Sequence, residues 1–125
     1  MENYGDIVEK INETFTKGDT EGFLSYCNDD LKWTIVGEET VTGKDAVRSF
    51  MAQMEGCEPP AFGVDAMAVD GDNVAAHGSM TMKDENGKEI AYRYCDFYRF
   101  KNGLVSELTS YIVKTTKGEE SDASN

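Results

Sequence analysis

The sequence predicts an α+β fold in which N-terminal helices cover a strongly curved, mostly antiparallel sheet and enclose a pocket for a small organic molecule. Apolar residues recur at helical spacing through the first half of the chain and alternate at strand spacing through the second half. Two Asn-Gly pairs stand between the alternating segments, and Asn-Gly is a strong signal for a tight hairpin. Because helices come first and antiparallel strands follow, this order is typical of α+β proteins. The length of 125 residues suits one domain, which we place at residues 1–116.

Two helices are expected before the first strand. The first covers Tyr4–Thr16, where apolar residues follow one another at intervals of three and four. Gly18 and Asp19 separate it from the second helix, because glycine suits the residue after a helix and aspartate can cap the next first turn. The second helix is expected at Thr20–Cys27, and the polar residues 28–30 end it.

A strand and a third helix complete the first half. Leu31–Val36 alternates between apolar and polar residues, which predicts a strand with Trp33 on its apolar face. Gly37–Gly43 is polar and is predicted to be a loop. Lys44–Met54 has apolar residues at helical spacing, and Glu58–Pro60 ends helical structure.

Four long strands are expected in the second half, because apolar and polar residues alternate along each of them. Short segments that contain Gly, Asn and Asp separate these strands, as turns require. The predicted strands are Phe62–Val69, Val74–Lys83, Lys88–Phe100 and Leu104–Lys114.

The two Asn-Gly turns also predict the register of three of these strands. If residues 86–87 form a two-residue turn, His77 lies opposite Asp96, and if residues 102–103 do the same, Asp96 lies opposite Thr109. A bulge in either hairpin would shift this row. The neighbouring rows on this face would be Ser79–Tyr94–Tyr111 and Ala75–Tyr98–Glu107.

A His–Asp pair on a covered sheet face would suit acid/base catalysis. Cross-strand neighbours have Cβ atoms about 5 Å apart, so the imidazole of His77 would reach the carboxylate of Asp96. The carboxylate would fix the imidazole tautomer while the imidazole moves a proton near neutral pH. Alternatively, burial could keep Asp96 neutral, so that it donates a hydrogen bond to a developing oxyanion. A purely structural pair fits the same pattern.

Further residues are candidates for substrate binding because they lie on the same predicted face or strand end. Tyrosines facing a helix layer fit the core as well as a pocket, and the tryptophan fits both equally. The substrate-binding candidates are Trp33, Tyr94, Tyr98, Glu107, Thr109 and Tyr111.

Composition argues against several classes of partner. The net charge of −12 repels phosphate backbones and anionic lipid surfaces, so we expect neither nucleic acid nor membrane as a partner. Cys27, Cys57 and Cys95 are odd in number and widely spaced, and His77 is the single histidine, which disfavours a metal site. We therefore expect reduced thiols, a cytoplasmic protein and no cofactor, with a disordered acidic tail at residues 117–125.

The order of elements resembles the nuclear transport factor 2-like superfamily, and within it the SnoaL-like polyketide cyclase and ketosteroid isomerase branch. Three segments with family-like order and spacing carry this resemblance over most of residues 4–114. They are Phe15–Phe23, Trp33–Gly37 followed by Thr42–Val47, and Cys95–Val105.

The resemblance implies a cone-shaped α+β barrel with a deep pocket, commonly in a homodimer. Asp96 matches the aspartic acid that ketosteroid isomerases use as an oxyanion donor. Two other parts of that machinery are absent, since the general-base position falls at Thr34 and Ile35 and the catalytic tyrosine aligns with Ile11. His77 and Asp96 would provide a different acid/base pair, closer to that of the cyclases.

The leading hypothesis is a cofactor-free acid/base enzyme, an isomerase, cyclase or related lyase or hydrolase, acting on a small carbonyl or polyketide-like compound. A non-catalytic binder of a small hydrophobic molecule and a protein-interaction domain are the alternatives, because this fold serves all three purposes. We also expect a homodimer, formed by an apolar sheet face that carries Cys95, Phe97, Leu108 and Ile112.

Overall fold

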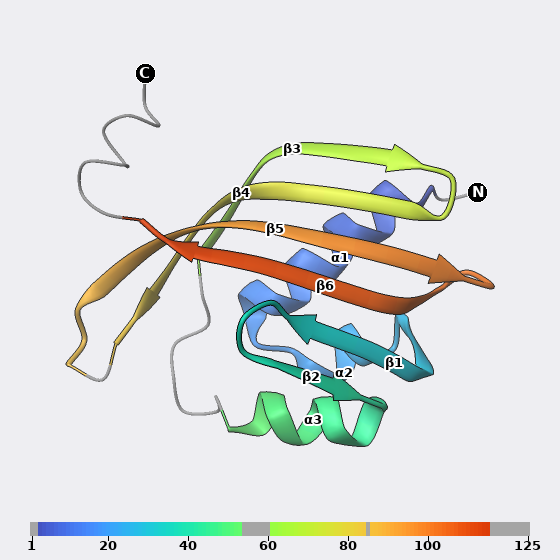
Figure 1. Cartoon of the computed structure of the whole chain (residues 1–125), viewed down its shortest axis with the longest axis horizontal. Coiled ribbons are helices and arrows are strands. Elements are labelled where there is room, and N and C mark those ends of the chain that lie inside the picture. The colour runs from blue at the N-terminus through green and yellow to red at the C-terminus, as the bar shows by residue number, and fades with distance from the viewer. Residues whose placement is uncertain (1–2, 54–60, 85, 116–125) are drawn as a thin grey trace.

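Three helices lie on one face of a six-stranded sheet in the computed structural model, which describes residues 3–53, 61–84 and 86–115 (Figure 1). Asn3 caps the first helix by accepting a hydrogen bond from the Asp6 amide, and Gly18 ends it with a left-handed φ of 68°. Asp19 then caps the second helix, as predicted. The helices are α1 (Tyr4–Lys17), α2 (Thr20–Leu24) and α3 (Lys44–Ala52).

The sheet has the order β2-β1-β6-β5-β4-β3. Neighbouring strands are antiparallel except for β1 and β6, which are parallel and join the N-terminal half of the chain to the last strand. The strands are β1 (Cys27–Ile35), β2 (Glu39–Thr42), β3 (Ala61–Asp70), β4 (Asn73–Lys83), β5 (Glu89–Lys101) and β6 (Leu104–Lys114). The predicted α+β class is confirmed, and over the described residues the sheet stays open between β2 and β3. Within that part of the chain, no helix is long and apolar enough to cross a membrane.

Two predicted elements differ from the structure. Helix α2 stops at Leu24, and β1 begins at Cys27, because Cys27 is buried and pairs with Val105 of the last strand. Part of the predicted loop at 37–43 is strand β2, since Val41 pairs with Trp33 across an antiparallel ladder. Both differences arise from pairing with distant or newly formed strands, which local spacing does not encode.

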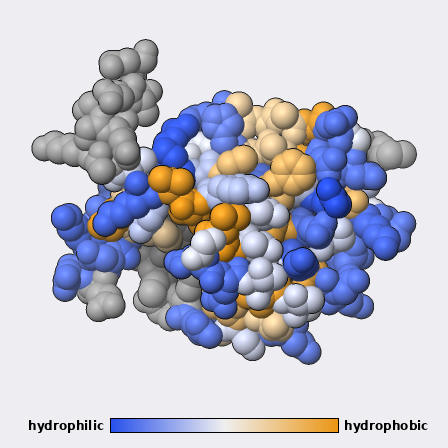
Figure 2. Space-filling model, in the orientation of Figure 1, coloured by the Kyte–Doolittle hydropathy of each residue, from blue (hydrophilic) through white to orange (hydrophobic). Residues whose placement is uncertain are grey.

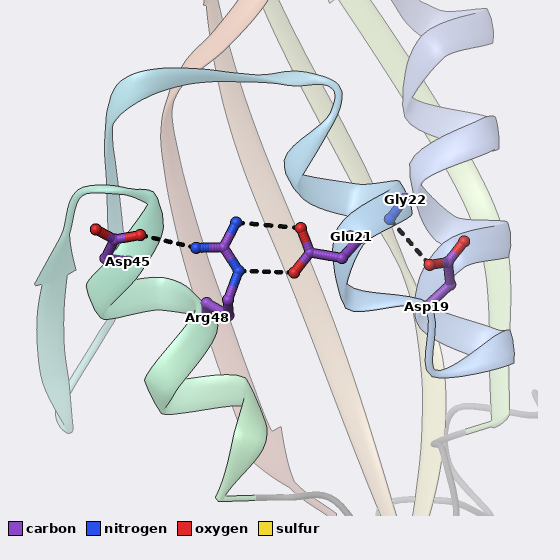
Figure 3. A network of polar contacts seen from close by, with 5 residues as sticks. All are labelled: Asp19, Glu21, Gly22, Asp45 and Arg48. Atoms are coloured by element: carbon purple, nitrogen blue, oxygen red, sulfur yellow. Dashed lines mark hydrogen bonds and ion pairs between the residues drawn. The ribbon is translucent and has the colours of Figure 1, made fainter.

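Arg48 of α3 holds the second and third helices together (Figure 3). Its guanidinium donates two hydrogen bonds to the carboxylate of Glu21 on α2, at 2.7 and 3.1 Å. A third hydrogen bond of 2.8 Å goes to Asp45, one turn earlier on its own helix. The hydrogen bond from Arg48 lowers the pKa of Glu21. The paired geometry therefore links α2 to α3 at the protein surface.

The hairpin between β4 and β5 has a three-residue loop where the sequence predicted two. Asp84 and Lys88 form the closing pair, with a hydrogen bond from the Asp84 amide to the Lys88 carbonyl, and Gly87 takes a positive φ of 79°. The Asp84 carboxylate also accepts hydrogen bonds from the amides of Asn86 and Lys88. The longer loop shifts the ladder by one residue, so that His77 pairs with Cys95 and Ala76 pairs with Asp96.

The hairpin between β5 and β6 has the predicted two-residue turn, with positive φ at Asn102 and Gly103, but a bulge follows it. The ladder pairs Phe100 with Val105, then shifts before the pair of Arg99 and Glu107. The bulge places Asp96 opposite Ser110, one residue from the predicted partner. Side chains alternate between the two faces of a strand, so these shifts change which residues of β4 and β6 share a face with Asp96.

We call the helix-covered side of the sheet the inner face and the opposite side the outer face. On β5 the inner face carries Tyr94, Asp96, Tyr98 and Phe100, all buried, and Tyr4 of α1 stacks on Phe100 with ring centres 4.1 Å apart. These side chains join the core beneath the helices. The inner face of β5 is therefore the floor of the interior.

Strand β3 bends closely over β4 near the edge of this interior. A bulge between Val64 and Ala66 shifts the β3 ladder, and the carbonyl of Gly63 lies against the open side of Gly78. The hydroxyl of Tyr94 donates a hydrogen bond of 3.1 Å to that carbonyl. Gly78 thus has no side chain because the backbone of β3 occupies the place of a Cβ atom.

We predict that Gly78→Ala destabilises the fold by about 1–3 kcal/mol, because its methyl group would overlap the Gly63 carbonyl and backbone must move to admit it. Gly63→Ala is the matched control, since an added Cβ there meets nothing within 4 Å. Its free energy of unfolding should stay within about 0.5 kcal/mol of the parent. Urea unfolding of the three proteins measures both changes, and equal stabilities would contradict this account.

Candidate functional site

Asp96 occupies the centre of the inner face, where three adjacent strands form one row. It pairs with Ala76 on β4 and with Ser110 on β6, and all three residues are buried. Only 7% of the Asp96 surface is exposed. A carboxyl group in such a position needs a reason, because a mid-strand site surrounded by core would be filled more favourably by an apolar side chain.

The predicted pairing of His77 with Asp96 is wrong. His77 pairs with Cys95 and lies exposed on the outer face, so its imidazole and the Asp96 carboxyl are on opposite sides of the sheet. The predicted partner Thr109 pairs with Phe97 on that same outer face. The physical cause is the three-residue loop in one hairpin and the bulge in the other, each of which shifts the register by one residue.

Three of the expected substrate-binding residues also face outward. Glu107 forms an ion pair of 3.2 Å with Arg99. These two residues are cross-strand partners on the outer face of β5 and β6. Tyr111 is 48% exposed, and Thr109 lies between these two on β6. Neither hairpin brings them to Asp96. In contrast, Trp33, Tyr94 and Tyr98 share the interior with it.

A directed chain of hydrogen bonds holds the carboxyl of Asp96. The indole Nε1 of Trp33 donates to the Ser110 hydroxyl oxygen at 3.0 Å, and the Ser110 hydroxyl in turn donates to Asp96. Burial raises the pKa of Asp96 to about 6 from its ordinary 3.8, and the hydrogen bond from Ser110 offsets part of that rise. The group therefore changes its protonation state close to neutral pH, as an acid/base catalyst must.

Aromatic rings surround the start of this chain at Trp33. The rings of Phe23 and Phe50 meet the indole edge to face, each with centres 5.7 Å away, and Phe15 lies at 6.1 Å. These rings come from all three helices. They hold the indole in one orientation and keep the surroundings of the Trp33–Ser110 hydrogen bond apolar, which strengthens it.

The two inner-face tyrosines on β5 flank Asp96 but differ in their partners. Tyr94 is tied to the Gly63 carbonyl, and burial raises its pKa to about 12. Tyr98 is fully buried, its pKa is also raised by burial, and its hydroxyl has no hydrogen-bond partner among the described residues. Both hydroxyls therefore remain protonated and can act as donors.

The inner-face rows on either side of Asp96 differ in exposure at one position. The row of Tyr98 with Leu108 is at most 1% exposed. In the row on the other side Gly78 and Tyr94 are buried, whereas Ile112 is 38% exposed.

Sequence reasoning missed Ser110, which it placed on the opposite face. One signal could have found it, because Val105 and Leu108 are both apolar and lie three residues apart. Both can face the core only if a bulge intervenes between them. Among the described residues, no three His, Cys, Asp or Glu side chains gather closely enough to hold a metal ion.

A shallow depression of about 470 Å³ lies elsewhere, on the helix layer beside the ion pairs of Figure 3. Arg48 at its wall is already engaged by Glu21 and Asp45. None of the predicted site residues contributes to it. The lining residues are Gly18, Asp19, Thr20, Glu21, Arg48 and Ala52.

Comparisons with known proteins give the same fold. The model of the SnoaL-like domain matches residues 8–108. An NTF2-like protein of unknown function from Cytophaga hutchinsonii is 30% identical and superposes with a TM-score of 0.70, over 82% of this chain and 93% of that chain. No curated protein sequence matches at a significant level.

Two further solved structures are more distant in sequence. An NTF2-like protein of unknown function from Burkholderia pseudomallei is 21% identical, with a TM-score of 0.81 over 88% of this chain and 90% of that chain. A putative polyketide cyclase from Xanthomonas campestris is 19% identical, with a TM-score of 0.77 over 86% of this chain and 87% of that chain. At these identities the likeness concerns the fold alone.

The raised pKa of Asp96 predicts how its replacement changes stability with pH. Because the folded pKa of about 6 lies above the ordinary 3.8, folding favours the protonated acid, and this benefit is lost as pH rises through 6. Asp96→Asn removes the charge that burial penalises. Relative to the parent, we expect its free energy of unfolding to rise by about 2 kcal/mol between pH 4 and pH 8.

Chemical denaturation at both pH values measures this difference. Ser110→Ala is the second variant, since removing the hydrogen bond that favours the carboxylate should raise the Asp96 pKa further, as followed by carboxyl-carbon NMR. A pKa at or below 4 in the parent protein would contradict the burial account.

Proposed function

The chain belongs to the SnoaL-like domain family, and from its buried carboxyl group we propose that it is a cofactor-free acid/base enzyme that moves a proton on a small carbonyl or polyketide-like compound. The observation that carries the proposal is the Asp96 carboxyl, which is buried on the inner face beside Ser110 and whose pKa burial raises to about 6. The putative polyketide cyclase from Xanthomonas campestris shares the fold, which is compatible with this proposal.

Asp96 suffices for proton transfer because of its surroundings. Above its pKa the carboxylate is ionised but poorly solvated, so taking up a proton from carbon relieves the cost of the buried charge. The neutral acid that results can return the proton to another position of the same molecule. This sequence is that of an isomerase or cyclase and needs no redox change.

Ser110 and Trp33 orient the catalytic group. The Ser110 hydroxyl donates a hydrogen bond to the Asp96 carboxyl. In the proposed reaction, a carboxyl oxygen that Ser110 does not engage takes the proton from the substrate. The N–H is the only polar group of the Trp33 indole, so the indole can only donate a hydrogen bond to the Ser110 oxygen. The hydroxyl hydrogen of Ser110 is then left to donate to Asp96.

The exchange of carbon-bound hydrogen for deuterium tests the proposal without knowledge of the natural substrate. A panel of small cyclic ketones and β-diketones is incubated with the protein in D₂O, and proton NMR follows loss of the signal next to the carbonyl. We expect exchange that rises with pH to a plateau above about pH 6, because the carboxylate is the acting base.

Asp96→Asn should slow this exchange by about 100-fold or more, which is the usual contribution of a general base. The matched control is His77→Gln, which changes a side chain on the outer face and should leave the rate unaltered. If Asp96→Asn exchanges as fast as the parent, the enzyme proposal fails and a non-catalytic binding or interaction domain takes its place.

We propose further that the protein forms a homodimer through its outer face. Figure 2 looks onto the sheet from the side opposite α1 and shows hydrophobic residues gathered across its middle. The expected interface needs correction, because Leu108 is buried in the core and Ile112 belongs to the inner face. The outer-face residues are instead Cys95, Phe97, Tyr111 and Val113.

Replacing Phe97 by aspartate should convert a dimer to a monomer, since it places a charge in the middle of this apolar surface. Val69→Asp is the control, because Val69 is similarly exposed but lies at the end of β3, on the side that faces α1. Light scattering at micromolar concentration measures both masses. A monomeric parent protein would rule the interface out.

A further inference from the structure

The single histidine of the chain, His77, lies in the middle of the apolar outer face. It pairs with Ala66 of β3 on one side and with Cys95 of β5 on the other, and Tyr111 of β6 continues the row. Phe97 lies in the adjacent row. The His77 side chain is exposed, and among the described residues it forms no hydrogen bond or ion pair. A titratable group therefore stands unpaired at the centre of the proposed homodimer interface.

The middle of the outer face carries balanced charge in a strongly acidic protein. Arg93 forms an ion pair of 2.8 Å with Asp65, and Arg99 forms one of 3.2 Å with Glu107. The whole chain nevertheless has a net charge of −12. Two copies therefore repel each other over the rest of their surface but not across this face. A neutral apolar face on an acidic chain suits a like-charged partner, which favours a second copy.

A symmetric dimer would bury His77 of both copies at once, because an isologous interface uses the same patch on each subunit. Histidine is the side chain whose charge ordinarily changes between pH 5 and pH 8. A neutral imidazole can be buried at modest cost, whereas an imidazolium needs an anionic partner in an interface.

The surroundings of His77 offer no such partner. The carboxylate of Asp65 is engaged by Arg93, and that of Glu107 is engaged by Arg99. Burial raises the pKa of the Cys95 thiol, so this neighbour stays neutral. The titratable or charged groups nearest to His77 along β3, β5 and β6 are Asp65, Arg93, Cys95 and Tyr111.

We propose that His77 makes the homodimer sensitive to pH, so that neutral imidazoles allow the two outer faces to join and protonation below about pH 6 separates them. This inference rests on the proposed homodimer, because it names how that same interface is regulated. It does not depend on the catalytic role of Asp96.

The direction of the effect identifies its cause. As pH falls, carboxylates take up protons and the repulsion between two acidic subunits weakens. A dimer without a histidine in its interface would therefore become tighter on acidification. Loosening of the dimer instead requires a group that gains positive charge inside the interface.

Sedimentation equilibrium at pH 7.5 and pH 5.5, at constant ionic strength, tests the inference. We expect the dissociation constant of the parent to rise at least about tenfold at the lower pH. The reason is that each subunit must release one proton before it associates, and two protons allow up to about 100-fold for each pH unit.

Two variants assign the change to one side chain. His77→Gln should form a dimer whose dissociation constant at pH 5.5 is no higher than at pH 7.5. Asp96→Asn is the matched control, because Asp96 also titrates near pH 6 but faces the interior, and this variant should loosen on acidification as the parent does. If His77→Gln loosens to the same extent as the parent, the inference is overturned.

The same measurements separate this inference from the homodimer on which it rests. A parent whose dimer is equally tight at both pH values overturns the role of His77 and leaves the homodimer standing. A parent that is monomeric at pH 7.5 overturns both, and the outer face is then left to a different protein.

Discussion

Two one-residue offsets beside β5 decide which side chains of the central strands face the interior. One is the three-residue loop closed by Asp84 and Lys88, and the other is the bulge after Val105. Side chains alternate between the two faces along a strand. Each one-residue offset therefore brings the other set of β4 or β6 side chains onto the same face as a given residue of β5. Together they place Ala76 and Ser110 beside Asp96 and leave histidine outside. The chemistry of the interior depends on this alternation.

The carboxyl of Asp96 is consequently governed by a serine and an indole instead of an imidazole. An imidazole partner could carry a positive charge and would hold the carboxyl ionised, whereas the chain from Trp33 through Ser110 supplies only neutral donors. Burial then dominates, and the group titrates near neutrality. One strand pair, β1 with β6, brings this chain together, because Trp33 and Ser110 lie on neighbouring parallel strands.

The parts of this structure that could be predicted from sequence are those with local causes. Gly18 and Asp19 end one helix and cap the next, and the Asn102-Gly103 turn has the positive φ angles that these residues favour. Register was not predicted to one residue, because the bulge is fixed by the joint burial of Val105 and Leu108, a tertiary effect whose local trace is the three-residue spacing of these two apolar residues. The aspartate at the centre of the site was therefore identified, but not its partners.

Some features had no local signal. Strand β2 lies in a polar segment and forms because β1 offers it an edge, with Val41 against Trp33. The parallel pairing of β1 and β6 depends on segments at opposite ends of the domain, and no turn connects them. Asn12 sits on a helix face that spacing alone marks as core, so its unpaired amide emerges only when the neighbouring side chains are placed.

The hydrogen bond between Trp33 and Ser110 joins residues 77 positions apart, and this separation has a consequence for biosynthesis. The helices and β1 leave the ribosome well before β6, so the aromatic cluster around Trp33 has no sheet to cover it until the last strand is made. Non-local pairing of this kind slows folding and lengthens the exposure of apolar surface. A chain that stops before β6 therefore presents Trp33 and its aromatic neighbours to chaperones and proteases. The interior is complete only once β6 has been made, so that no product ending before this strand acquires the buried acid.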